Sequence, residues 1–339
     1  MLIDGYVIEV EKAREWVKRN RLRRILIQSP PGLWRQAREL AEELSRDLDD
    51  VLLYGGSCWG GCDLAIHSAK LVKADGIIHL GHARFLRSEP LPTLYLECRR
   101  ADPKPILKLL EEGVDRLRGY RRIGLGMTVQ WLDHLGLIRE KLRELGLEVF
   151  TEAPEPPLEY EGQILGCSYT PLLKLSNRVD CYLIIGSRFH GLGLALQTSK
   201  PVYSLDPELQ KFYDSRLEAE KVLRIRYAYI EKFRSVREAG VLVSIKPGQY
   251  RLGLASRVRS LLRRAGKYAE VLIMDDIVID RLRDSGFGGF VNTACPRLSI
   301  EDQMMFEKPI LLPAEAMIAV GERSWEEVVR TPSYFSMEV

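Results

Sequence analysis

Short apolar runs alternate with amphipathic stretches along almost the whole of this 339-residue chain. The apolar runs are rich in β-branched residues, and runs of this kind are typical of buried strands. They form three sets of four: Arg24–Gln28, Val51–Tyr54, Gly76–Leu80 and Thr93–Glu97; Ile123–Val129, Leu147–Thr151, Tyr182–Ile185 and Val202–Leu205; and Val241–Ile245, Glu270–Met274, Gly289–Asn292 and Pro309–Leu312. Strands that alternate with helices predict parallel sheets flanked by helices. We therefore predict an α/β fold of three flavodoxin-like units.

The segments between these runs predict helices and loops. Residues 36–45 and 137–145 carry apolar side chains at three-to-four spacing, which is typical of amphipathic helices. A longer helical stretch over 208–238 joins the second unit to the third, while prolines predict a loop over 152–162. We place the units at residues 1–117, 118–225 and 226–339. We expect the three units to surround a central site.

Composition and charge narrow the class of protein. Apolar residues make up 46% of the chain and charged residues 29%, which is ordinary for a globular protein. The net charge of +3 argues against a surface that wraps nucleic acid. The N-terminus lacks the basic stretch of a secretion signal, and no apolar run approaches the roughly 18 residues of a membrane span. We therefore expect a cytoplasmic protein that binds neither nucleic acid nor membranes.

Six cysteines in a chain of this length do not indicate a disulfide scaffold. In a reducing compartment, such residues pack in the core, bind metal or take part in catalysis. Cys98 ends one predicted strand and Cys181 opens another, so we expect both to be buried packing residues. The other four cysteines lie in predicted loops.

Each predicted unit has at least one of these loop cysteines. Cys62 lies in a glycine-rich turn before a predicted helix over 63–74, Cys167 follows a glycine, and Cys295 directly follows a strand. Three thiolates suit a 4Fe–4S cluster with one iron left open, whereas zinc sites usually have a close pair of ligands. Cys58 and Cys62 form the one close pair. Spacing alone therefore leaves an iron–sulfur cluster, zinc and simple packing open.

Seven short segments resemble signatures of the archaeal diphthamide synthase family, the 2-(3-amino-3-carboxypropyl)histidine synthases. They are Gln28–Leu33, Trp59–Asp63, His79–Ala83, Gly162–Cys167, Gly186–His190, Val243–Gln249 and Thr293–Arg297. These segments follow the family's order from about residue 20 to about residue 315, and the three loop cysteines stand 105 and 128 residues apart. By this resemblance the chain is identified as a member of the family.

The resemblance implies a homodimer of three-domain subunits, in which Cys62, Cys167 and Cys295 hold one 4Fe–4S cluster and Cys58 has no required role. It also implies radical cleavage of the Cγ–S bond of S-adenosylmethionine. The resulting 3-amino-3-carboxypropyl group is joined to an imidazole carbon of one histidine in translation elongation factor 2, as the first step of diphthamide synthesis. An electron donor of unidentified kind is a further expected partner.

Four other residues are candidates for binding S-adenosylmethionine. Arg297 could pair with its carboxylate, and Asp302 could accept a hydrogen bond from its ammonium or ribose. Lys246 and Gln249 lie in a turn after the first strand of the third unit. The alternatives are a local surface ion pair for the first two residues and a solvated turn for the other two.

Two histidines are candidates for a catalytic or substrate-facing role. His190 and His82 both follow predicted strands, and a hydrogen-bonded structural histidine is the alternative for His190. His79 lies within a strand, so we expect it in the core.

Other functions share parts of this pattern. Quinolinate synthase resembles the chain in architecture, with three α/β units and three cysteines on an open 4Fe–4S cluster, but it is a dehydratase that needs no S-adenosylmethionine. A non-catalytic α/β binding scaffold with packed cysteines is a second alternative. A relative with the same cluster and a different acceptor is a third.

Overall fold

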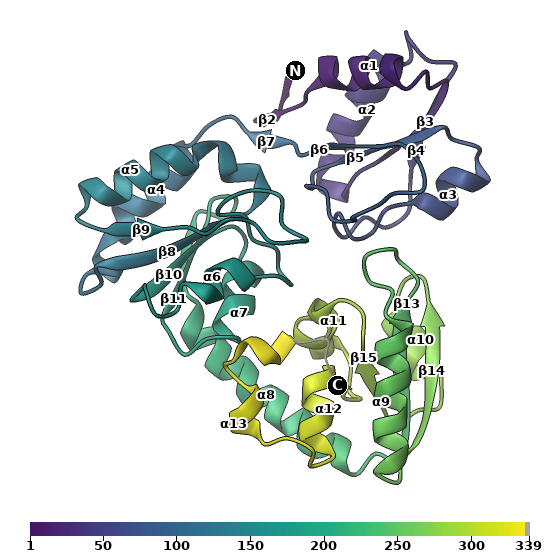
Figure 1. The fold of residues 1–339 in the computed structure, drawn as a ribbon, viewed down its shortest axis with the longest axis vertical. Helices are drawn as coiled ribbons and strands as arrows, with labels where there is room; N and C mark the ends of the chain where they lie inside the picture. Colours follow the sequence, from purple (N-terminus) through teal and green to yellow (C-terminus); the bar gives the residue numbers. More distant parts are fainter. Residues whose placement is uncertain (336–339) are drawn as a thin grey trace.

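Three mainly parallel sheets, each with helices on both of its faces, form the computed structural model, which describes residues 1–335 (Figure 1). The first unit has the strand order β4-β3-β5-β6, with all strands parallel. Its strands are β3 (Arg24–Gln28), β4 (Asp50–Tyr54), β5 (Gly76–Leu80) and β6 (Thr93–Leu96). Its helices are α1 (Val10–Arg19), α2 (Trp34–Leu44) and α3 (Ile66–Leu71). A small antiparallel sheet of β1 (Leu2–Ile3), β2 (Tyr6–Val7) and β7 (Arg99–Arg100) lies beside it.

The second unit has the order β9-β8-β10-β11-β12. Its strands are β8 (Arg122–Met127), β9 (Glu148–Phe150), β10 (Cys181–Ile185), β11 (Val202–Asp206) and the antiparallel edge strand β12 (Lys211–Asp214). Its helices are α4 (Lys104–Gly113), α5 (Leu135–Glu144), α6 (Thr170–Lys174) and α7 (Arg188–Ala195).

The third unit has the order β14-β13-β15-β16, again fully parallel. Its strands are β13 (Glu238–Ser244), β14 (Tyr268–Met274), β15 (Gly289–Asn292) and β16 (Ile310–Leu311). Its helices are α9 (Leu252–Arg264), α10 (Ile279–Arg283), α11 (Pro296–Ile300), α12 (Pro313–Ala319) and α13 (Trp325–Val328). Short 3-10 helices occupy Pro31–Leu33, Val114–Leu117, Val129–His134, Asp302–Met305 and Pro332–Phe335.

The three sheets share one topology. In each, the first two strands are exchanged in space and the third lies beside the first, as in flavodoxin-like folds. Ligands of such sheets bind beyond the carboxyl ends of the strands, at the point where the strand order reverses. The predicted α/β architecture of three flavodoxin-like units is confirmed.

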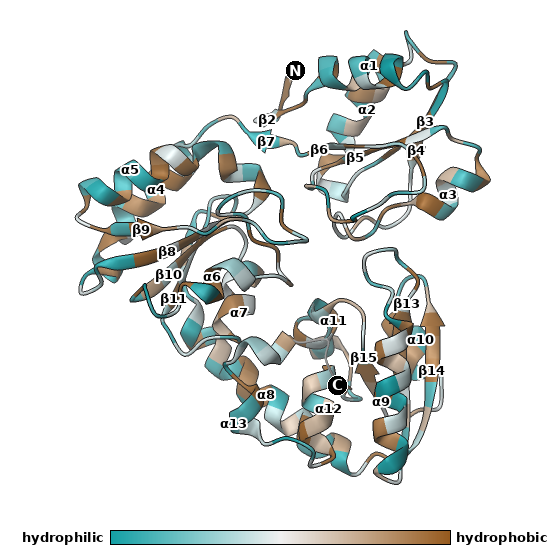
Figure 2. Ribbon diagram, viewed as in Figure 1, coloured by the Kyte–Doolittle hydropathy of each residue, from teal (hydrophilic) through white to brown (hydrophobic). Residues whose placement is uncertain are grey.

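Alternate residues of each strand face opposite layers of helices. In the first sheet, Ile25 and Ile27 pack toward α1 and α2, whereas Leu26 and Ile77 pack toward α3. Figure 2 shows the same pattern throughout, with hydrophobic residues gathered on the strands and on the inner faces of the helices. Within residues 1–335, no helix is both long and apolar enough to cross a membrane.

The stretch 208–238 differs from its prediction as a single helix. Residues Lys211–Asp214 form β12, which pairs antiparallel with β11, and the helix α8 begins only at Ser215 and ends at Arg234. The Asp214 carboxylate accepts a hydrogen bond from the Arg216 amide at 3.0 Å, which caps α8 at this point. The helix predicted over 63–74 is also shorter, since α3 spans Ile66–Leu71. The division into three sequence ranges stays a prediction, and α8 crosses its second boundary.

A buried ion pair fixes α8 against the third unit. The Arg226 guanidinium bonds to both carboxylate oxygens of Glu315 at 2.9 and 2.5 Å and donates to the Ser299 carbonyl at 2.6 Å. Tyr334 donates a further hydrogen bond to Glu315 at 2.6 Å. Each charged group is thus paired and hydrogen-bonded, which burial of charge requires.

Candidate functional site

The loop between β4 and α3 carries Cys62 and is built from close backbone contacts. The Asp63 amide donates to the Gly60 carbonyl at 3.0 Å, which closes a tight turn around the cysteine. A Cβ on Gly61 would lie 2.5 Å from the Ala83 carbonyl oxygen, so only glycine fits there. The glycines therefore let this loop lie directly against the segment that follows β5.

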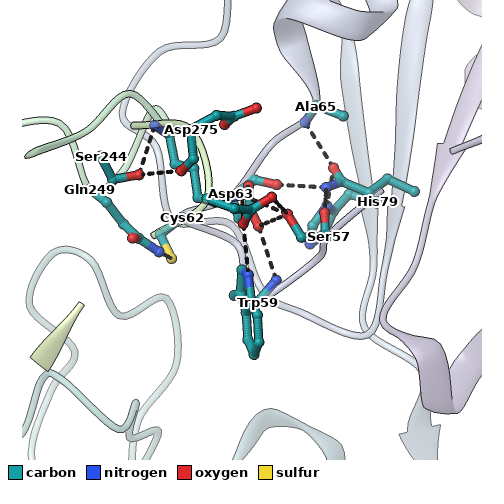
Figure 3. A network of polar contacts seen from close by, with 12 residues as sticks. Ser57, Trp59, Cys62, Asp63, Ala65, His79, Ser244, Gln249 and Asp275 are labelled. Carbon is teal, nitrogen blue, oxygen red and sulfur yellow. Dashed lines mark hydrogen bonds and ion pairs between the residues drawn. The ribbon is translucent and has the colours of Figure 1, made fainter. Parts of the chain in front are cut away.

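A turn of the third unit, residues 245–250, packs on the Cys62 loop. The Gly248 amide donates to the Cys62 carbonyl at 2.8 Å, and a Cβ on Gly248 would lie 2.6 Å from the Cys62 Cα. The Gln249 side-chain amide contacts the Cys62 Sγ at 3.4 Å (Figure 3). Gln249 is only 7% exposed, so the alternative of a solvated turn is wrong.

Lys246 joins the same two units through a buried ionic network. Its Nζ lies 2.8 Å from Asp63 Oδ1, 2.7 Å from Ser57 Oγ and 3.1 Å from Asp276 Oδ1, and the residue is 6% exposed. Burial opposes the charge of the ammonium, but the bonds to Asp63 and Asp276 outweigh it and raise the pKa of Lys246. The amine predicted to bind S-adenosylmethionine thus already has three oxygen partners.

The loop of Cys167 is a two-residue turn of the second unit. Leu165 and Ser168 exchange backbone hydrogen bonds of 3.3 and 3.2 Å, so Gly166 and Cys167 form the tip. The Phe189 ring fills the position of a Gly166 Cβ, which would lie 2.4 Å from it. The turn is therefore held from behind, and Cys167 is solvent-exposed at its tip.

Cys295 directly precedes α11 of the third unit. The Asn292 side chain donates to the Cys295 carbonyl at 2.7 Å and accepts from the Ala294 amide at 2.9 Å, which fixes the connection from β15. Cys295 thus lies beyond the carboxyl end of the third strand of its sheet, where flavodoxin-like folds build their sites.

The charges of the three predicted thiols influence one another. Burial raises the pKa of the Cys167 thiol, and the charges of Cys295 and Cys62 raise it further. Burial and the charge of Cys62 also raise the pKa of Cys295 to about 11. Charges act this way only over short distances in a protein. The thiols of the three units are therefore close enough to influence one another, and Cys167 is solvent-exposed although burial of its thiol raises its pKa.

Arg251 acts on two of these thiols and was not predicted from the sequence. Burial raises the pKa of the Cys62 and Cys167 thiols, and the positive charge of Arg251 opposes that rise in both. Its Nη1 lies 3.3 Å from the Gln249 carbonyl and 3.5 Å from the Thr293 carbonyl, so it links the turn on Cys62 to the Cys295 loop. The sequence signal that could have identified Arg251 is its position two residues after Gln249, the last residue of the motif Val243–Gln249.

Arg297 and Asp302 lie near Cys295, but they do not form the ion pair considered from sequence. Arg297 Nε bonds to Glu301 Oε2 at 2.5 Å, and its guanidinium stacks on the Phe189 ring at 5.0 Å. Burial raises the pKa of Asp302, and the charge of Arg297 opposes the rise. The charge of Arg297 lowers the pKa of the Cys295 thiol, whereas the charge of Asp302 raises it.

His190 lies beside Arg297 at the start of α7. Burial and the charge of Arg297 lower the pKa of His190 to about 4, against a smaller raising effect of a Ser187 backbone hydrogen bond. Its Nδ1 lies 2.8 Å from Ser187 Oγ. The imidazole is therefore neutral at physiological pH, with one ring nitrogen engaged.

His82 contacts His79, with its Nδ1 2.9 Å from His79 Nε2. His79 is fully buried in β5, as predicted for a core residue. Burial lowers the pKa of His82 to about 4. Cys58 is 6% exposed, while Cys98 and Cys181 are buried, as predicted for packing residues.

Comparisons with known proteins agree with the geometry. A family model described as putative diphthamide synthesis protein matches residues 29–330. The 2-(3-amino-3-carboxypropyl)histidine synthase of Pyrococcus horikoshii is 36% identical over 321 residues, which are 93% of this chain and 92% of that protein. Subunit 1 of the Kluyveromyces lactis enzyme is 24% identical over 345 residues, 99% of this chain and 80% of that protein.

A solved structure matches over nearly the full length. The crystal structure of Dph2 from Pyrococcus horikoshii with a 4Fe-4S cluster has a TM-score of 0.87 at 34% identity, covering 96% of this chain and 93% of that chain. The family model, the identity with a characterised relative and the shared fold all agree. The chain therefore belongs to the family of diphthamide synthesis proteins.

Proposed function

We propose that this protein is a 2-(3-amino-3-carboxypropyl)histidine synthase that acts on translation elongation factor 2. It transfers the 3-amino-3-carboxypropyl group of S-adenosylmethionine to a histidine imidazole carbon, as the first step of diphthamide synthesis. The observation that supports the proposal is that the charges of Cys62, Cys167 and Cys295, which come from three separate units, act on one another's thiols.

We propose these three thiols as the ligands of a 4Fe–4S cluster, and the residues around them fit such a group. The charges of the three thiols act on one another, Gly248 places no side chain against Cys62, and Cys167 is solvent-exposed. The Arg251 guanidinium supplies positive charge beside a group that carries several thiolates. When bound, a cluster with an open iron supplies the single electron that a sulfonium accepts as its C–S bond breaks.

The chain's own residues orient the reactants. Arg297 is placed to pair with a carboxylate, at the cost of its bond to Glu301, and Asp302 to accept from an ammonium. The neutral His190 can exchange a proton near the same place. Lys246 and Gln249 act on the loop of Cys62: the first holds it through Asp63, and the second donates toward the sulfur.

Two further parts of the proposal concern partners. A homodimer and an electron donor complete the enzyme, as the sequence resemblance implies. Elongation factor 2 must reach the site with one histidine side chain, and we expect it to approach on the side where Cys167 is exposed.

Label transfer tests the function directly. Protein reconstituted without oxygen is mixed with reductant, elongation factor 2 and S-adenosylmethionine labelled in its carboxyl carbon. Label is expected on elongation factor 2, and none when its target histidine is replaced. Cys62→Ala is expected to abolish transfer, whereas Cys98→Ala, at a buried cysteine outside the site, is the matched control. A cluster-bearing protein that labels no elongation factor 2 would refute the proposal and favour a different acceptor.

A further inference from the structure

Cys58, His79 and His82 form a compact group that the proposed reaction does not use. Their ligand atoms all lie within 4.8 Å of one another. Cys58 comes from the loop after β4, His79 from the end of β5, and His82 from the segment that follows it. Cys58 is 6% exposed and His79 is fully buried. Within residues 1–335, no hydrogen bond satisfies the Cys58 sulfur.

The hydrogen bonds of Gln28 determine which ring nitrogen of His79 carries the proton and which has a lone pair for metal. Gln28 donates from its side-chain amide to the Asp63 carbonyl at 2.6 Å, so its carbonyl oxygen points the other way. That oxygen accepts from the Ala65 amide at 2.9 Å and lies 3.1 Å from His79 Nδ1. A carbonyl oxygen can only accept, so His79 must donate from Nδ1. Its Nε2 therefore carries a lone pair.

That lone pair points toward the other members of the group. His79 Nε2 lies 2.9 Å from His82 Nδ1, and Cys58 Sγ is within reach of both rings. A metal-binding imidazole usually donates its other ring N–H to a carboxylate, a backbone carbonyl or a water, and the Gln28 side-chain oxygen takes that role for His79.

We propose that Cys58, His79 and His82 bind one Zn²⁺-class ion, separate from the iron–sulfur cluster. One thiolate and two imidazoles are a ligand set that Zn²⁺ prefers, with water in the fourth position. Tetrahedral binding at zinc bond lengths requires ligand atoms about 3.3–3.6 Å apart. In the structure the two ring nitrogens lie 2.9 Å apart and all three ligand atoms lie within 4.8 Å of one another, so binding requires the rings to separate slightly and the sulfur to stay close to both. Asp63 and Cys62 remain free for their own contacts.

The ion would pin the Cys62 loop to the first sheet. Cys58 stands four residues before Cys62 in the same loop, while both histidines belong to the end of β5 and its continuation. The loop would then be held on one side by metal and on the other by Lys246 of the third unit. The alternative is a metal-free pair of hydrogen-bonded histidines beside a packed cysteine.

Metal analysis of the cluster-loaded protein distinguishes a zinc site from a metal-free pair of histidines. The chain is reconstituted with iron and sulfide, incubated with a small excess of Zn²⁺, and desalted before both metals are measured. We expect about one zinc ion per chain beyond the cluster iron, and zinc-edge X-ray absorption with one sulfur near about 2.3 Å and two nitrogens near about 2.0 Å. The X-ray absorption spectrum is measured on the unmodified protein, so this test remains valid even if the substitutions impair folding.

Variants then assign the ligands. Cys58→Ala is expected to lower bound zinc at least about tenfold while iron stays unchanged, and His82→Gln to do the same. Cys98→Ala, also buried, should change neither metal. No retained zinc, zinc that displaces iron, or zinc content unchanged in Cys58→Ala would each overturn the proposal.

Discussion

Replacing Lys246 with methionine tests how the first and third units are held together at Cys62. The substitution keeps most of the aliphatic stem and removes the ammonium that lies 2.8 Å from Asp63 and 3.1 Å from Asp276. It leaves the Asp63 carboxylate buried, with weaker hydrogen bonds from the Trp59 amide at 3.2 Å and Ser57 Oγ at 3.4 Å. We expect the turn over 245–250 to separate from the Cys62 loop more often.

The size of the effect follows from burial. Removing one partner of a buried ion pair costs about 3–5 kcal/mol. The Asp63 carboxylate keeps its hydrogen bonds from Trp59 and Ser57, so the cost should fall near the lower limit. The Asp276 side chain is 43% exposed, so its share is below about 1 kcal/mol. A cost of about 3 kcal/mol corresponds to a roughly 100-fold change in the opening equilibrium.

Hydrogen exchange measures this opening without requiring the whole chain to unfold in one step. The Gly248 amide donates to the Cys62 carbonyl, so its exchange reports separation of the two loops. Exchange of the peptide that contains Gly248 should be about 100-fold faster in Lys246→Met, and at most about fivefold faster in Asp276→Asn. Adding Asp63→Asn to Lys246→Met should recover much of the loss. Less than a tenfold change in Lys246→Met, or no recovery in the double variant, would refute the reasoning.

Three further predictions concern the cluster loop and its surroundings. Cys62→Ala should lose the iron and the visible absorption of the reconstituted protein, whereas Cys58→Ala should keep both; equal iron in the two variants would contradict the ligand assignment. Gly248→Ala should lower the free energy of unfolding by about 1–3 kcal/mol, because its Cβ would lie 2.6 Å from the Cys62 Cα. Gly136→Ala, where a Cβ meets nothing within 4 Å, should be neutral or slightly stabilising, and thermal denaturation of both variants measures the difference. His190 gains its proton near pH 4 when folded, compared with 6.5 ordinarily, so the unfolded state binds more protons between these values and stability falls as pH falls. His190→Asn should therefore remove about 2 kcal/mol of the stability lost between pH 7 and pH 5 in urea titrations, and an unchanged pH dependence would argue against a neutral His190.

The sheets could be predicted from sequence because their strands are buried on both faces. Arg24–Gln28 and Gly76–Leu80 match their predicted ranges fully, since continuous apolar runs bounded by charges or glycine leave few alternatives. β12 could not be found this way. Its four residues, Lys211–Asp214, lie at an exposed edge and pair antiparallel through the backbone, so they carry little hydrophobic signal.

Site residues that belong to a local motif could be predicted from sequence. Contacts between residues of different units could not. The three loop cysteines were recognised from their motifs. The engagement of Lys246 was not, because its partner Asp63 lies 183 residues away in sequence, and only packing of the units brings them together. Arg251 was missed for the same reason. Its neighbours, Cys62 and Cys167, come from the other two units.

The most direct test of the central claim is anomalous diffraction at the iron edge from crystals of the anaerobically reconstituted protein. We expect one compact iron peak at bonding distance from the sulfurs of Cys62, Cys167 and Cys295. An iron peak bonded to Cys58 in place of one of them, or no iron where the three loops meet, would contradict the account.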